Sequence, residues 1–156
     1  MLYVDTSVIV KLYVKEKHSS SFSNWLKKNN EAIPLTVFHE LEFNNAINLK
    51  EFRGEITTDE IRLIMAKFAE HENRGVFYRP KINWTDTFKY AVNLSKEHTK
   101  KTGSRSLDIL HVASALLIKA DKFLTFDERQ SRLAFHAGIK IESGIPIGHS
   151  SGMIDE

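Results

Sequence analysis

The sequence contains no cysteine among its 156 residues. This absence excludes a disulfide-stapled scaffold, a thiol nucleophile and any zinc or iron–sulfur site with cysteine ligands. It also fits a protein of a reducing compartment. A chain of this length can bury a core of its own, so neither a disulfide nor a metal is needed to hold a single domain together.

A strong charge of one sign is also missing. Lys and Arg number 22 against 20 Asp and Glu, a net charge of +2, so the overall charge gives little support for a nucleic-acid partner. The chain does not open with a basic segment and a long apolar run, so we expect neither a signal peptide nor a membrane-spanning helix. The expected location is the cytoplasm.

Three common catalytic motifs are absent. The sequence has no Gly-x-Gly-x-x-Gly and no P-loop, which removes the usual support for dinucleotide or nucleoside-triphosphate chemistry. It has no His-Glu-x-x-His, so a zinc-protease site has no support either. The composition, 42% hydrophobic and 27% charged, is that of an ordinary folded protein. Any chemistry must therefore come from other residues.

Short apolar segments alternate with stretches of helical periodicity. The expected strands are residues 2–4, 32–35, 76–78, 123–126 and 139–141. The expected helices lie between them, starting near Ser7, His18–Ser21, Thr36, Thr57 or Thr58, Thr85, Ser106 and Glu128. This alternation predicts a three-layer α/β/α domain whose central, mostly parallel sheet is flanked by helices. We expect this domain over residues 1–142, followed by a flexible C-terminal tail, 143–156, rich in Gly and Ser.

Four acids lie where the predicted strands end and helices begin. Asp5 and Asp127 each follow a strand, and Asp108 and Glu40 each stand in the first turns of a helix. Ligands of parallel sheets gather at the carboxyl ends of the strands, so these side chains are expected at one edge. Carboxylates brought together repel one another unless a cation lies between them. Oxygen ligands of this kind suit a hard divalent ion such as Mg²⁺ or Mn²⁺.

Each acid taken alone also has a structural explanation. An acid in the first turn of a helix is favoured by the helix dipole, and Asp5 is well placed to cap the helix that follows it. Asp108 is the hardest to explain in this way, because its apolar neighbours Leu107, Ile109 and Leu110 would leave an unpaired carboxylate in a costly environment. The functional interpretation therefore depends on the four acids together.

Four segments, in order, resemble a known family. They are Leu2–Ile9 (LYVDTSVI), Phe38–Glu42 (FHELE), Ser106–Leu116 (SLDILHVASAL) and Phe123–Asp127 (FLTFD). From Leu2 to about Ile141 the chain resembles a PIN domain, and in particular the VapC-like toxins of type II toxin–antitoxin systems. The resemblance implies metal-dependent endonucleolytic cleavage of RNA by a homodimer that a cognate antitoxin inhibits.

The resemblance also implies a set of site residues. The acids that would bind Mg²⁺ or Mn²⁺ and carry catalysis are Asp5, Glu40, Asp108 and Asp127, with the hydroxyls of Ser7 and Thr125 as nearby supporting groups. Arg105 and Lys101, in the basic segment that leads into the helix of Asp108, are the expected substrate-binding cations. His111, one turn beyond Asp108, could reach the site, but its apolar helix favours a hydrogen-bonded core histidine.

Two glutamates close together in the sequence, Glu40 and Glu42, are candidates for the acid of this predicted helix. Glu42 follows Glu40 by two residues and therefore lies on a different face of the helix. Glu40 immediately precedes Leu41, as the acid of the family does, so the site is assigned to Glu40 and Glu42 is expected to be solvated or ion-paired. The apolar stripe of this helix is expected to contain Val37, Leu41, Ala46 and Leu49 or Ile47.

Two other functions remain open at this stage. A haloacid-dehalogenase-like phosphohydrolase also begins with an acid at the end of its first strand, but it needs a second Asp two residues later, where this chain has Ser7. A non-catalytic PIN-like module that binds RNA or protein is disfavoured, because such a module has no reason to keep four mutually repelling acids.

Overall fold

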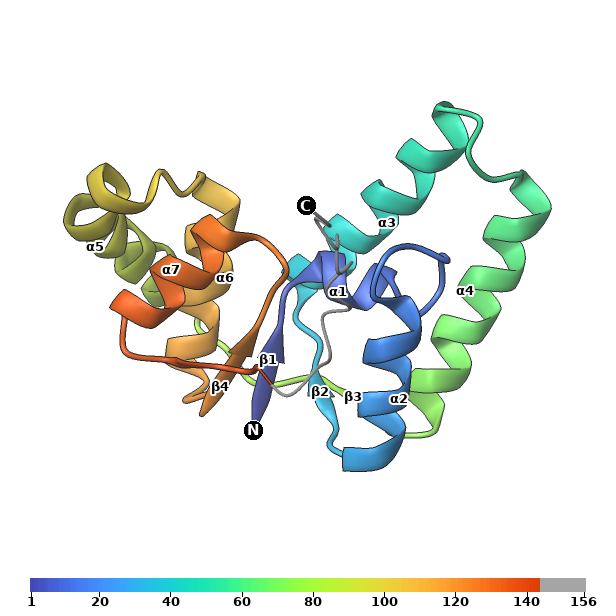
Figure 1. Ribbon diagram of the computed structural model, residues 1–156, viewed down its shortest axis with the longest axis horizontal. Coiled ribbons are helices and arrows are strands. Elements are labelled where there is room, and N and C mark those ends of the chain that lie inside the picture. Colours follow the sequence, from blue (N-terminus) through green and yellow to red (C-terminus); the bar gives the residue numbers. More distant parts are fainter. Residues whose placement is uncertain (144–156) are drawn as a thin grey trace, which may run out of the picture.

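The computed structural model describes residues 1–143 and contains the predicted alternation of strands and helices (Figure 1). The strands are β1 (Leu2–Val4), β2 (Ile33–Pro34), β3 (Phe77–Tyr78), β4 (Lys122–Leu124) and β5 (Lys140–Ile141). The helices are α1 (Thr6–Val10), α2 (Ser19–Asn29), α3 (Val37–Phe52), α4 (Thr58–Asn73), α5 (Trp84–Thr102), α6 (Ser106–Leu117) and α7 (Glu128–His136). All but the first residue of the expected tail, 143–156, lie outside the described residues.

The strands are all paired in parallel, which confirms the predicted sheet type. β4 lies between β1 and β5 in a three-stranded ladder, and β2 pairs with β3 in a second ladder. The two ladders lie side by side at β1 and β2 (Figure 1). Ile33 and Leu35 donate their N–H groups to Val76 and Tyr78, toward β3, so the intervening Pro34 faces β1. Because proline has no N–H, β2 cannot continue the ladder toward β1 at that position.

Alternation along β1 creates the three layers. Leu2 and Val4 pack into a core shared with α1, α2, α3 and α4, whereas Tyr3 packs into a core shared with α5, α6 and α7. Successive side chains of a strand point to opposite faces of the sheet, so one three-residue strand contributes to both cores. This arrangement confirms the predicted α/β/α fold.

Helix α6 is deeply buried, as its apolar circumference predicted. Most of its side chains are buried, including those of Asp108 and His111. The helix begins one residue earlier than expected: its cap is Arg105, whose backbone N–H donates to Asp108 Oδ2 at 3.0 Å. The helix therefore brings a carboxylate and an imidazole to the edge of an otherwise apolar core.

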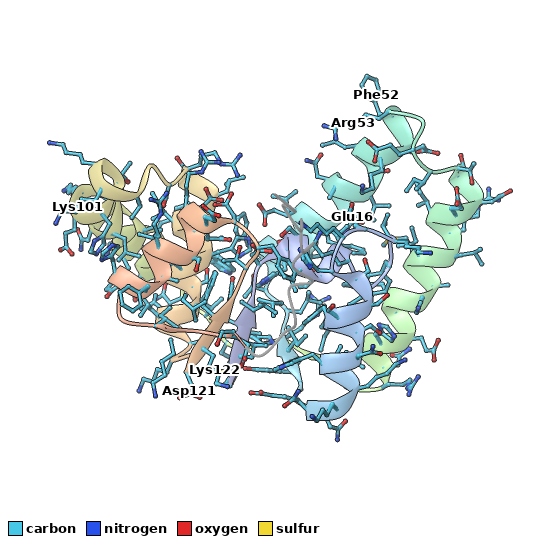
Figure 2. The ribbon with its side chains drawn as sticks, in the orientation of Figure 1. Glu16, Phe52, Arg53, Lys101, Asp121 and Lys122 are labelled. Atoms are coloured by element: carbon cyan, nitrogen blue, oxygen red, sulfur yellow. The ribbon has the colours of Figure 1, made fainter. Side chains whose placement is uncertain are left out.

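The helices α3 and α4 run side by side to a tip that projects beyond the sheet (Figure 1). Phe52 lies at this tip and is 88% exposed (Figure 2). Val37 and Leu41, expected in the apolar stripe of α3, are also exposed, and the buried stripe contains Phe43 and Ile47. Within residues 1–143 no helix is long and apolar enough to cross a membrane.

Candidate active site

Asp5 lies at the carboxyl end of β1 and caps α1. Its Oδ1 accepts hydrogen bonds from the Ser7 hydroxyl at 2.6 Å and from the Val8 N–H at 3.0 Å. Its Oδ2 accepts a short hydrogen bond from the Thr125 hydroxyl. The side chain is 5% exposed, so these three donors compensate for the loss of water around a buried carboxylate.

Thr125 and Asp127 form the adjacent part of the site, just beyond β4. The Thr125 hydroxyl that donates to Asp5 accepts the Asp127 N–H at 3.0 Å, so one side chain joins two acids. Asp127 caps α7, where its Oδ1 accepts the N–H groups of Arg129 at 2.8 Å and Gln130 at 3.1 Å. Both acids therefore act as helix caps and also lie at one edge of the sheet.

Asp108 stands in the first turn of α6 and is held by Arg105. The Arg105 N–H and Nε–H both donate to Asp108 Oδ2, at 3.0 and 3.2 Å, and Oδ1 has no hydrogen bond from another residue in 1–143. The same guanidinium lies 3.9 Å from Asp127 Oδ2. Arg105 therefore links the acids of two helices, and its side chain is 67% exposed.

α3 contributes Glu42 to the same region. Glu42 Oε2 accepts hydrogen bonds from the Thr6 hydroxyl at 2.5 Å and from His111 Nε2 at 2.6 Å. His111 in turn is 2.9 Å from the Tyr3 hydroxyl through Nδ1. These contacts connect the acid of α3 with α1, β1 and α6.

A cavity of about 370 Å³ brings these groups together. Four carboxylates line it, and they come from the ends of β1 and β4, from α3 and from α6. The polar lining residues are Asp5, Thr6, Ser7, Glu42, Asn45, Arg105, Asp108, His111, Asp127 and Gln130. Segments far apart in the sequence thus converge on one acidic cavity at the carboxyl ends of the strands.

The surroundings of two acids favour their charged forms. Burial opposes ionisation of Glu42, but the hydrogen bonds from His111 and from the Thr6 hydroxyl outweigh it and lower the pKa of Glu42. Burial likewise opposes ionisation of Asp127, and the N–H groups of Gln130 and Arg129 with two nearby guanidinium groups lower its pKa. Both side chains are therefore carboxylates at neutral pH.

Comparison with known proteins gives the family. The PIN domain family matches residues 2–136, which is most of the chain. The chain belongs to the PIN domain family. A crystal structure of FitAcB from Neisseria gonorrhoeae has a similar fold, with a TM-score of 0.60 and 16% identity over 90% of this chain and 96% of that chain. No curated protein sequence matches this chain significantly.

PIN domains are generally nucleases and usually use divalent metals. The structure does not, however, bring Glu40 to the acidic cavity of this PIN domain. Glu40 lies on the exposed side of α3, where its Oε2 pairs with Arg79 at 2.8 Å. Glu42 lines the cavity in place of Glu40, and of the two roles expected for it the structure supports a pairing, with His111 at 2.6 Å. Successive residues of a helix are about 100° apart around its axis. Glu42 therefore lies within the arc between the buried residues Phe38 and Ile47, whereas Glu40 falls just outside this arc.

The two expected substrate-binding cations lie in different places. Arg105 lines the cavity. Lys101 does not line it and lies at the outer end of α5, on the far left of the view in Figure 2. Arg129, which follows the cap of α7, approaches Asp127 Oδ2 at 3.7 Å and is a second cation beside the site.

The donor set of the cavity fits a hard divalent cation. As the side chains stand, no group of three or more histidines and acids in the described residues is close enough to hold a metal ion. All four cavity acids, however, supply carboxylate oxygens, and the donors that hold them leave lone pairs unused, such as those on Asp108 Oδ1 and Glu42 Oε1. Carboxylates completed by water are the usual ligands of Mg²⁺. Arg105, the cation now between Asp108 and Asp127, has an exposed side chain with room to move.

Two further polar side chains at the cavity were not singled out from the sequence. Gln130 is 2% exposed and lies near Asp108, and Asn45 lies one turn after Glu42 on α3. A spacing signal exists for Asn45, because a residue three positions after Glu42 shares its helix face. Gln130 carries no such signal, since its burial depends on how α7 packs against α6.

Proposed function

We propose that this PIN domain is a metal-dependent endoribonuclease that hydrolyses RNA phosphodiester bonds in the cytoplasm. The observation that carries the proposal is the convergence of Asp5, Glu42, Asp108 and Asp127 on one cavity. Clustering four carboxylates is unfavourable unless a cation is to be bound there. The family, whose members are generally nucleases, gives the reaction class.

The four carboxylates would hold Mg²⁺ or Mn²⁺. When bound, such an ion lowers the pKa of a coordinated water and neutralises charge that develops on the phosphate. Ser7 and Thr125 orient Asp5 by donating hydrogen bonds to its two oxygens. Thr125 also fixes Asp127 through the backbone N–H that it accepts, so Asp5 and Asp127 keep a constant relative position.

Arg105 is the residue we assign to the RNA backbone. Its guanidinium fork suits phosphate oxygens, and its exposed side chain lies at the cavity between two acids. If a cation replaces Arg105 beside Asp108 and Asp127, the guanidinium becomes available for a phosphate of the substrate. Lys101 is a candidate for a more distant phosphate, along the outer end of α5.

The deciding experiment is an RNA-cleavage assay on the full chain with Mg²⁺ or Mn²⁺, with EDTA, and with Asp108→Asn. Asparagine can still accept the Arg105 N–H, so the fold should persist while a negative ligand is lost. Cleavage should fall by more than the roughly 10–100-fold that is typical of groups next to a metal ligand.

A matched control is Asp86→Asn, since Asp86 is also in the first turn of a helix but pairs with Lys89 at the surface, away from the cavity. It should cleave like the wild type. Full activity of Asp108→Asn would sink the site assignment. RNA binding without metal and without cleavage would support the non-catalytic binding module instead. The haloacid-dehalogenase alternative has lost its support, because the chain is a PIN domain and Ser7 serves Asp5 as a hydrogen-bond donor.

We extend the proposal to partners: the chain acts as the VapC-like toxin of a toxin–antitoxin pair, as a homodimer silenced by its antitoxin. Large apolar side chains at the surface support protein partners. Phe88, Val92 and Leu107 are each more than half exposed and line a groove of about 240 Å³ between α5 and α6. Light scattering of the purified protein should give twice the mass of one chain, and a monomer at all concentrations would contradict the dimer.

A further inference from the structure

His111 is buried yet hydrogen-bonded through both ring nitrogens. The side chain is 4% exposed. Nε2 lies 2.6 Å from Glu42 Oε2, and Nδ1 lies 2.9 Å from the Tyr3 hydroxyl. A histidine that only filled space in the core would not need a carboxylate at one nitrogen and a phenol at the other.

The partners of His111 define which nitrogen carries its proton. A carboxylate can only accept, so Nε2 is the protonated nitrogen and donates to Glu42. In the neutral ring Nδ1 is then an acceptor, and the Tyr3 hydroxyl is its donor.

The ring is also fixed in orientation by its neighbours. It packs against the rings of Phe38, His39 and Tyr3, with centroid distances of 4.6, 5.0 and 5.8 Å. His39 cannot donate to Glu42 in place of His111, because His39 Nε2 donates to the Val4 carbonyl and its Nδ1 accepts from the Thr36 N–H. These three rings fix the orientation of the His111 ring and therefore the direction in which its Nε2–H points.

The consequence for Glu42 is that its two oxygens differ. The His111 and Thr6 donors converge on Oε2, whereas Oε1 accepts no hydrogen bond from another residue within 1–143. Glu42 lines the acidic cavity, so the oxygen without a donor belongs to a carboxylate at the cavity surface.

We propose that His111 and Tyr3 are positioning residues of the metal site, which hold Glu42 through one oxygen and leave the other for the cation. The inference rests on the proposed function and names two residues that act through Glu42 without touching the metal. Such outer partners of metal ligands typically change metal affinity by about 10–100-fold when they are replaced.

The test measures Mn²⁺ affinity of the full chain by calorimetry. His111→Leu removes the donor to Glu42 and should weaken Mn²⁺ binding by about 10–100-fold. His111→Gln can place an amide N–H near the position of Nε2, so it should restore most of the affinity. Tyr3→Phe removes only the hydroxyl and should weaken binding by less than His111→Leu. In a Glu42→Gln background, His111→Leu should have no further effect.

His71→Gln is the matched control, since Nδ1 of His71 also lies close to a tyrosine hydroxyl, that of Tyr13 at 2.8 Å, but His71 does not line the acidic cavity. It should leave Mn²⁺ affinity unchanged. Equal Mn²⁺ affinity of wild type and His111→Leu, with Glu42→Gln clearly weaker, would overturn the inference and spare the proposed function. No Mn²⁺ binding by the wild type would overturn the metal site itself, and the inference with it.

A second readout needs no metal. In ¹⁵N spectra of the metal-free protein, His111 should be protonated at Nε2 and unprotonated at Nδ1, and Tyr3→Phe should reduce the population of this form. A wild-type ring protonated only at Nδ1 would contradict the proposed direction of the hydrogen bonds, whether or not Mn²⁺ binds.

Discussion

At the scale of single residues, structural and functional roles coincide in the same carboxylates. Asp5 and Asp127 cap α1 and α7 by accepting N–H groups from the first turn of each helix. A cap usually explains an acid at a helix start without any further role. Here the capping bonds occupy one oxygen of Asp127, and the remaining oxygen faces Arg105 and Arg129. Capping therefore places these acids at the cavity and still leaves carboxylate lone pairs that can bind a cation.

Replacing each of the two nearby glutamates of α3 by glutamine in turn gives a prediction at this scale. Glu42→Gln should lower metal-dependent RNA cleavage by roughly 10–100-fold or more, because it removes a negative ligand from the cavity. Glu40→Gln should cleave like the wild type, because it breaks only the surface ion pair with Arg79, which is worth about 0–1 kcal/mol. The measurement is initial cleavage rate in Mn²⁺. The reverse ranking would restore Glu40 as the acid of the site.

The sequence predicts the acids at strand ends better than the acid on a helix face. Asp5 and Asp127 follow apolar strands and Asp108 opens an apolar helix, so chain order alone indicates where they lie. The position of Glu42 depends on which stripe of α3 faces the core. That stripe is set by the packing of Phe43 and Ile47 against β-strands and helices from elsewhere in the chain, and the pattern of apolar residues on α3 allowed a second stripe through Leu41.

At the scale of helices and strands, the sequence predicts where a helix begins more reliably than it predicts which strands pair. The capping box of Thr57 and Glu60 begins α4 where the pattern predicts it. The strand order, and the division of the sheet at Pro34, follow from contacts between distant segments that no local pattern encodes.

The turn between α5 and α6 carries a prediction at this scale. Gly103 ends α5 with a φ of +66°, a conformation that costs a residue with a side chain about 1–2 kcal/mol. Gly103→Ala should therefore lower the free energy of unfolding by about 1 kcal/mol, after the smaller entropy of the unfolded alanine chain is counted. Urea denaturation of the metal-free protein measures the change.

Lys119 provides the matched comparison, because it is an exposed residue with a φ of +59° just after α6. Lys119→Gly should stabilise the protein by a similar amount, about 1 kcal/mol, for the same conformational reason. Opposite signs at the two positions would show that backbone conformation decides the effect. A stabilising Gly103→Ala would contradict the role of this turn, which leads directly into Arg105 and Asp108.

At the scale of the whole molecule, the two cores meet through buried polar groups beside β1. Tyr3 packs in the core of α5, α6 and α7, and its ring also lies 4.9 Å from His39 of α3. His39 Nε2 donates to the Val4 carbonyl of the same strand. Global stability therefore depends on an imidazole that can keep these bonds only in its neutral form.

This dependence predicts how stability changes with pH. Burial lowers the pKa of His39 from 6.5 to about 3. As the pH falls through 6.5, the His39 imidazole takes up a proton in the unfolded chain but stays neutral in the folded chain. This contribution to stability is therefore complete above pH 6.5 and is lost as the pH drops toward 3. Between pH 7 and 5 the loss should be about 2 kcal/mol. The lowered pKa values of Glu42 and Asp127 act only at lower pH, within and below the ordinary carboxyl range.

The measurement is the free energy of unfolding from urea titrations at pH 7, 6 and 5, for the wild type and for His39→Gln. Glutamine can donate to the Val4 carbonyl and accept the Thr36 N–H but does not titrate, so the variant should start less stable and lose much less between pH 7 and 5. His18 and His71, whose pKa values are also lowered by burial, are present in both proteins and cancel in the comparison. Parallel pH profiles of the two proteins would show that His39 is not the group that makes this fold acid-sensitive.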